Sequence, residues 1–173
     1  MRRYGLIEHM RLWATGIIVA ITLVLTSCEN TSFRSSVPVY PVRVIIDTRV
    51  GAFVHFQPTV LNSHIVVNRN GFFMDGKYVL PVTAVDAWGY GGVVAYVGLN
   101  GYCAFDLACP YCAGRGSCHP CEVIEPFAVC PFCGEEYDLG SGLAMPQHGI
   151  SHETLRPLNI FSSDGKLTIT QRQ

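Results

Sequence analysis

The chain has 173 residues, a formal net charge of −1, and a composition that is 49% hydrophobic and 14% charged. This length suits one globular domain with a real core. The near-neutral charge, without a basic patch of the kind that binds phosphate backbones, excludes nucleic acid as an expected partner. The sequence contains no Ser-His-Asp arrangement, phosphate-binding loop or dinucleotide fingerprint. No motif therefore argues for an enzyme.

The N-terminus has the pattern of an export signal. Basic residues precede an apolar stretch from Leu12 to Thr26, which is short for a membrane span and suits a signal-peptide core. The stretch ends in Leu-Thr-Ser-Cys, which resembles the bacterial lipobox. That resemblance implies cleavage before Cys28 and a lipid on its sulfur. We therefore predict a signal peptide over residues 1–27 and a lipid-anchored protein of the bacterial cell envelope; an uncleaved signal anchor is the alternative.

Two details refine this prediction. Glu29 follows Cys28 where an aspartate would suggest retention in the inner membrane, so the outer membrane is favoured, on either its periplasmic or its surface face. Arg2 and Arg3 echo a twin-arginine signal, a route for proteins that fold around a cofactor before export. Gly5 stands where that signal has an aromatic residue, and the apolar core fits general secretion better.

A small, polar and proline-containing segment follows the lipidation site. Residues 28–41 are predicted to be a lipidated tether, and residues 42–173 the folded domain. Loss of three arginines and Glu8 with the leader changes the formal charge of the mature chain from −1 to −3.

The folded region shows little helical periodicity and many short, β-branched runs separated by Gly, Asn and Asp. This pattern predicts an all-β fold, an antiparallel sandwich or barrel. The predicted strands are residues 42–47, 52–56, 64–68, 71–74, 92–97, 102–107, 123–129 and 166–170.

Asn100-Gly101 is the strongest hairpin signal in the chain. In the strand that follows, Cys103 shares one face with Phe105 and Leu107. We therefore predict that Cys103 packs in the core as a small hydrophobe rather than binding a ligand. The flexible aromatic segment from Trp88 to Gly92 is predicted to be a turn.

Two Cys-x-x-Cys pairs lie at the spacing of a four-cysteine metal site, with 17 residues between them. Each pair forms a turn that can direct two thiolates at one ion, and two turns complete a tetrahedron. A proline follows the first cysteine of each pair and stiffens its turn, and Gly134 permits a positive φ after the second pair. The predicted ligands are Cys109, Cys112, Cys130 and Cys133, within a metal-loop region spanning residues 103–145.

The segment VCPFCGEEYDLGSG, residues 129–142, resembles the second cluster-binding loop of Rieske proteins and Rieske-type ferredoxins. The residues that match that loop are Cys130, Gly134, Tyr137, Asp138, Leu139 and Gly142. AFDLACPY resembles the first loop, with Cys109 in register, and ETLRPLNI resembles the return strand near Ile160. The resemblance covers about residues 93–170 and implies a Rieske-like domain.

The departures from that family concern the ligands. Rieske clusters take two histidines as well as two cysteines, but here Tyr111 and Cys133 stand in the histidine positions. A two-histidine centre is therefore excluded. The open alternatives are a structural Zn²⁺, an all-cysteine [2Fe–2S] cluster that passes electrons to an envelope redox partner, disulfides, or a vestigial site.

A third pair, Cys118 and Cys121 with His119 between them, lies in an insert. Three roles are open for this pair: a disulfide, a set of substitute metal ligands, or a dithiol that exchanges disulfides with other proteins. Because a strand-like run follows instead of a helix, thiol exchange is the least favoured of these. Seven cysteines remain beside Cys28, so disulfides alone leave one unpaired.

The remaining titratable residues carry no predicted ligand role. His55 and His64 lie in strand-like runs and are expected to be packed or surface residues. His148 and His152 are expected in a loop. The acidic side chains that follow the second pair, Glu135, Glu136 and Asp138, are expected in turns and on the loop surface.

Overall fold

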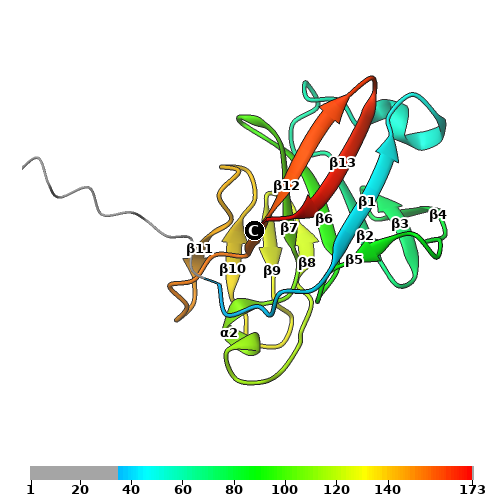
Figure 1. Cartoon of the computed structure of the whole chain (residues 1–173). Helices are drawn as coiled ribbons and strands as arrows, with labels where there is room; N and C mark the ends of the chain where they lie inside the picture. The colour runs from blue at the N-terminus through cyan, green and yellow to red at the C-terminus, as the bar shows by residue number, and fades with distance from the viewer. Residues whose placement is uncertain (1–34, 173) are drawn as a thin grey trace, which may run out of the picture. The chain divides into compact units, whose positions relative to one another are not determined.

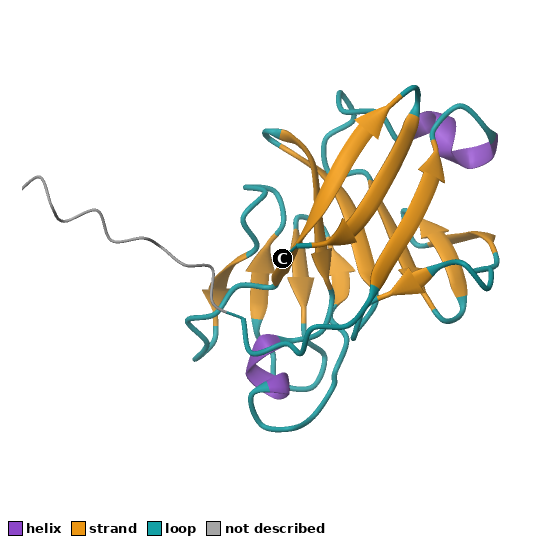
Figure 2. Ribbon diagram, in the orientation of Figure 1, coloured by secondary structure: helices purple, strands orange, loops and turns teal. Residues whose placement is uncertain are grey.

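The computed structural model describes residues 35–172 as an all-β protein built from two antiparallel sheets, which confirms the predicted fold class (Figures 1 and 2). The large sheet has nine strands, in the order β4 (Lys77–Leu80), β3 (Gly71–Met74), β2 (His64–Asn68), β6 (Val93–Gly98), β7 (Gly101–Asp106), β12 (Arg156–Ser163), β13 (Lys166–Gln171), β1 (Val42–Asp47) and β5 (Ala87–Trp88). The small sheet has four strands, in the order β11 (Met145–His148), β10 (Glu136–Asp138), β9 (Phe127–Val129) and β8 (Glu122–Ile124).

The large sheet bends around the first of two hydrophobic cores. Val44 and Ile46 of β1 share this core with Ile65 and Val67 of β2, although four strands of the sheet order separate β1 from β2. The two ends of the sheet must therefore face each other, as in a sandwich or barrel. Figure 1 shows β1, β12 and β13 crossing in front of β2 and β6.

The second core lies between the large sheet and the small sheet. Val94 and Tyr96 of β6 and Phe105 of β7 pack here against Ala128 of β9 and Tyr137 of β10. The residues that alternate with Val94 and Tyr96 along β6 point into the first core, so β6 is buried along both faces. This double burial explains why the run from 92 to 97 is apolar throughout rather than alternating.

Most predicted strands have the expected positions. β1, β2 and β3 have the predicted bounds, and β6, β7 and β13 differ from them by one residue at one or both ends. β6 and β7 form the predicted hairpin, in which Gly98 pairs with Gly101 across Leu99 and Asn100. Phe105 and Leu107 pack in the second core with half-buried Cys103 against it, while Ala104 faces the first core, as the alternation indicated.

Two predicted strands are wrong. The run 52–56 is not a strand. Its first four residues lie in a 3₁₀ helix, η1 (Gly51–His55), and Phe56 caps the C-terminal end of this helix, so that Phe53 and Phe56 both lie in the first core. Residues three apart lie on one side of a 3₁₀ helix, so both phenylalanines are buried together. The run 123–129 is two short strands, β8 and β9, joined by a turn at Glu125-Pro126. Proline cannot donate a ladder hydrogen bond, so the run breaks there.

The chain already packs on the domain before residue 42. Val37 is buried, and the Arg156 guanidinium donates to its carbonyl oxygen at 2.9 Å. The carboxylate of Glu153 accepts hydrogen bonds from the backbone amide and hydroxyl of Ser36. The predicted signal peptide, the predicted lipidation site Cys28 and the first part of the predicted tether lie outside the described residues. Within residues 35–172, no helix has the length and hydropathy needed to span a membrane.

Candidate metal centre

Two loops at the same end of the small sheet carry the paired cysteines. In the first loop, Cys109 follows β7 and precedes the short helix α2 (Pro110–Ala113), which contains Cys112. In the second, Cys130 follows β9 directly and Cys133 lies in the turn before β10. Figure 1 shows α2 beside the lower ends of β9 and β10. The pairing of β9 with β10 thus sets the position of the second loop.

The four predicted ligands lie together. The Sγ atoms of Cys109, Cys112, Cys130 and Cys133 all lie within 4.8 Å of one another. The Cys109–Cys133 sulfur distance is 3.6 Å and the Cys112–Cys130 distance is 3.8 Å. Sulfur atoms at about 2.3 Å from a tetrahedral ion stand about 3.8 Å apart. The group can therefore bind a metal ion without a large rearrangement.

The two turns share one backbone design. The amide of Ala113 donates to the Cys109 carbonyl oxygen, and the amide of Gly134 donates to the Cys130 carbonyl oxygen, each at 2.9 Å. Gly134 has the predicted positive φ, 74°. Backbone amides also point at sulfur, that of Cys112 toward Cys109 and that of Glu135 toward Cys133. Such amides stabilise thiolates, so each turn is shaped for negatively charged sulfur.

Cys109 is the best-stabilised thiolate of the group. A hydrogen bond from the Cys121 thiol, and a second from the Tyr137 hydroxyl, outweigh its burial and lower the pKa of Cys109 to about 4. The hydroxyl of Tyr137 lies 3.5 Å from the Cys109 sulfur. Burial raises the pKa of the Tyr137 hydroxyl, which therefore keeps the proton that it donates.

Two of the other ligands, Cys112 and Cys133, resist ionisation when no cation is bound. Burial raises the pKa of Cys133 to about 12 and also raises that of Cys112. Four thiolates at these distances repel one another, and only a cation at their centre removes that repulsion. Binding of a metal must therefore release protons from this group.

The insert cysteines have different surroundings. The buried thiol of Cys121 donates to Cys109, and this hydrogen bond together with burial raises the pKa of Cys121. Cys118 is exposed, and its sulfur contacts the Tyr90 carbonyl oxygen at 3.6 Å. Both are free thiols, as are all seven cysteines in the described part of the chain. Cys121 therefore contacts a ligand of the four-cysteine group, whereas Cys118 does not belong to it.

Aromatic stacking covers the outer side of the loops. His119 stacks on Phe132 with ring centroids 4.1 Å apart and an interplanar angle of 2°. Phe132 itself is 70% exposed. The guanidinium of Arg115 lies 3.5 Å from the ring centroid of Tyr111. Neither His119 nor Tyr111 is part of the four-cysteine group.

Glu135 corrects one expectation of the sequence. It was predicted on the loop surface, but it is buried to 1% exposure. Its carboxylate accepts hydrogen bonds from the amides of Ile150 at 2.5 Å and Ser151 at 3.2 Å. A Cβ on Gly149 would lie only 2.2 Å from this carboxyl carbon. Glu135 therefore holds the 149–151 turn against the second cysteine loop, and local sequence offers no sign of this role.

Apart from His119, the histidines within residues 35–172 divide into two kinds. His55, His148 and His152 are exposed, and His148 ends strand β11 instead of lying in the expected loop. His64 is buried beside Asp75 and Glu125, a grouping that no local pattern in the sequence indicated.

Together these features define an all-β protein with a largely buried four-cysteine group that can bind a metal. No protein-family model matches the chain, and a comparison with curated proteins finds no match either.

Proposed function

We propose that this protein is a bacterial envelope lipoprotein whose Rieske-like domain holds one structural Zn²⁺ through Cys109, Cys112, Cys130 and Cys133. The observation that carries the proposal is the gathering of four thiol sulfurs within 4.8 Å. Zinc favours such closed sulfur tetrahedra, and it does no redox chemistry in them. The ion would clamp the two loops to each other, and so the end of β7 to the end of β9.

The sulfur distances favour one ion over a two-iron cluster. An all-cysteine [2Fe–2S] cluster divides the four cysteines between two irons, with the bridging sulfides between the irons. Sulfurs bound to different irons must then stand farther apart than sulfurs that share one ion. Here all four sulfurs lie within 4.8 Å of one another, including those from opposite loops.

An electron carrier is the second candidate. It is supported by the sequence resemblance to Rieske loops and by the position of Cys133, which is only half-buried beside the exposed ring of Phe132. Such a site would exchange electrons with an envelope redox partner. Thiol–disulfide exchange has less support, since Cys118 and Cys121 contact different partners.

Metal analysis tests the proposal. The mature chain from Glu29 is purified without added metal, and its zinc, iron and acid-labile sulfide are measured. We expect about one zinc per chain and no sulfide. The Cys112→Ser variant should lose the zinc, whereas the control Cys118→Ser should retain it.

The other outcomes of the metal analysis each have a definite meaning. Two irons with two sulfides would overturn zinc in favour of an electron-carrying cluster, and one iron without sulfide would indicate a single redox-active ion. A chain with neither metal, even after zinc is offered under reducing conditions, would end both candidate functions.

A further inference from the structure

A second group of metal-ligating side chains lies away from the four cysteines. It joins three segments: His64 at the start of β2, Asp75 in the turn between β3 and β4, and Glu125 in the turn between β8 and β9. The His64 Nδ1 lies 3.2 Å from a carboxylate oxygen of Glu125 and 3.6 Å from one of Asp75. One ligand atom from each side chain lies within 4.8 Å of the other two.

The oxygens around His64 Nδ1 outnumber the protons that it can donate. The Asn62 carbonyl oxygen also faces this nitrogen, at 3.4 Å. A ring nitrogen carries at most one hydrogen, so one N–H cannot serve three oxygens well. A cation at the centre of the group would interact with all of them, and the neutral ring nitrogen would then bind it as a ligand.

One of the carboxylates is held in place by its own hydrogen bonds. The Asp75 Oδ1 accepts from the backbone amide of His64 at 2.9 Å and from the Ser63 hydroxyl at 3.3 Å. The His64 ring is buried and stacks on Tyr96 with centroids 6.3 Å apart. Two of the three ligands are therefore positioned before any ion arrives, which lowers the entropic cost of binding.

The charge balance also favours a cation. Neither Asp75 nor Glu125 forms a salt bridge with a lysine or arginine within residues 35–172; their only basic partner there is His64. Both side chains are nearly half exposed, at 46% and 45%, so an ion can reach them from solvent. Two carboxylates thus face one imidazole, an arrangement that a divalent ion would neutralise.

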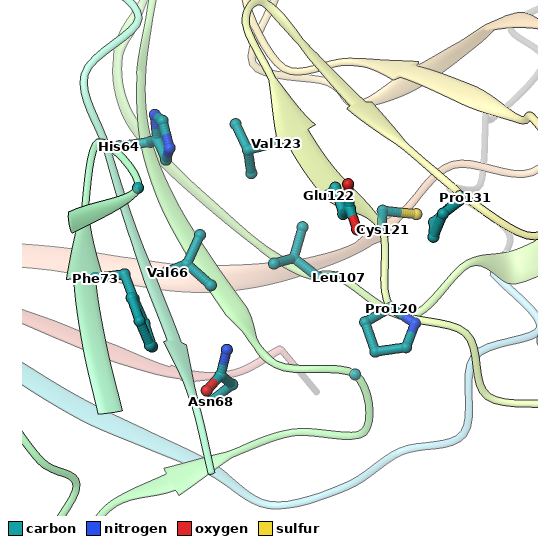
Figure 3. Close-up of a pocket in the computed structure, with 12 residues that line it drawn as sticks. His64, Val66, Asn68, Phe73, Leu107, Pro120, Cys121, Glu122, Val123 and Pro131 are labelled. Atoms are coloured by element: carbon teal, nitrogen blue, oxygen red, sulfur yellow. The ribbon is translucent and has the colours of Figure 1, made fainter. Parts of the chain in front are cut away.

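The group adjoins a pocket of about 500 Å³ between the two sheets, to which His64 contributes. Figure 3 shows His64 and Cys121 on opposite sides of this pocket. The apolar side chains of Val66, Leu107 and Val123 lie between them. The His64 site is separate from the four-cysteine group, which adjoins this pocket only through Cys121, the thiol that donates to Cys109.

We propose that His64, Asp75 and Glu125 bind a divalent first-row transition ion through one nitrogen and carboxylate oxygens. This mixed set of carboxylate oxygens and one imidazole nitrogen suits an ion such as Mn²⁺, unlike the sulfur set of the four cysteines. Because Glu125 lies in the β8–β9 turn, the ion would tie the small sheet, which leads into Cys130, to β2 of the large sheet.

Mn²⁺ is the probe, because thiolate sites bind it weakly and carboxylate–imidazole sites bind it well. The mature chain is titrated with Mn²⁺, and free Mn²⁺ is followed by electron paramagnetic resonance. We expect one bound ion per chain. Glu125→Gln and Asp75→Asn, which keep the shape of the side chains, should each weaken binding at least tenfold. Glu122→Gln, on the same hairpin but outside the group, should leave it unchanged.

The outcomes separate this site from the four-cysteine site. Cys112→Ser should bind Mn²⁺ like the unaltered chain, and the two carboxylate variants should keep the zinc content of that chain. Absence of Mn²⁺ binding at millimolar concentration would overturn the proposal, and so would binding that both carboxylate variants retain. Circular dichroism of each variant verifies that the fold persists.

Discussion

At the scale of single residues, Tyr137 connects the second core to the candidate metal centre. Its ring is fully buried between the sheets, and its hydroxyl reaches the Cys109 sulfur. Groups that hydrogen-bond to a metal ligand fix its orientation and tune its charge. Tyr137 therefore acts on the ligand, not on the ion.

We predict that Tyr137→Phe weakens zinc binding about tenfold, because a hydrogen bond to a metal ligand contributes on this order to affinity. Competition with a chromophoric chelator measures the change. Tyr102→Phe is the matched control. The Tyr102 side chain packs against the first core, and its hydroxyl donates to the Phe56 carbonyl oxygen, away from the candidate metal centre. Equal zinc affinities in the two variants would show that the Tyr137 hydroxyl has no role at the centre.

Residue-level reasoning from the sequence succeeded where the determining contacts are local. The cysteine pairs and Gly134 form turns whose shape depends on four or five consecutive residues, so spacing alone indicated them. Glu135 was placed wrongly, on the loop surface, whereas His64 is packed but was left without a ligand role. Their burial depends on the 149–151 turn and on Asp75 and Glu125, which local sequence does not bring together.

At the scale of elements, the segment before β1 belongs to the packed structure from Ser35 onward. It lies across the surface near β12, where Arg156 and Glu153 hold its backbone. A run of small residues and prolines predicts a tether when it is considered alone. The burial of Val37 places residues 35–41 against the domain instead.

We predict that a chain beginning at Val42 is less stable than one beginning at Ser35 by about 2 kcal/mol, the usual contribution of one buried valine side chain. Loss of the Arg156 hydrogen bond to Val37 adds to this difference. Urea unfolding followed by fluorescence measures it. Chains beginning at Glu29 and at Ser35 should unfold at the same urea concentration. If the chain from Val42 also does, the segment does not stabilise the domain.

At the scale of the whole molecule, the export signal and the domain make separate contributions to the proposed function. In that proposal the predicted leader would direct the protein to the cell envelope, and the lipid on Cys28 would hold it there. Within the described residues, the cysteines stay free although the proposed compartment is oxidising, and bound zinc would protect the four ligands from disulfide formation.

We predict that the full chain incorporates labelled palmitate when a bacterial host produces it, because lipidation attaches acyl chains at Cys28. The Cys28→Ser variant should incorporate none, since it lacks the acceptor sulfur. Cys118→Ser serves as the control, as an exposed cysteine outside the lipobox, and should be labelled normally. A full chain without label would contradict the lipoprotein assignment and leave the metal centre unaffected.

The sequence by itself determined the all-β class and the four-cysteine group, because β-branched runs, turn residues and Cys-x-x-Cys spacing act over a few neighbouring positions. Only the tertiary structure decided three other features: the burial of β6 on both faces, the hydrogen bond from Tyr137 to Cys109, and the meeting of His64 with Asp75 and Glu125. Each depends on how the small sheet packs on the large one. That packing is fixed by two cores whose side chains come from distant parts of the chain, so no local pattern encodes it.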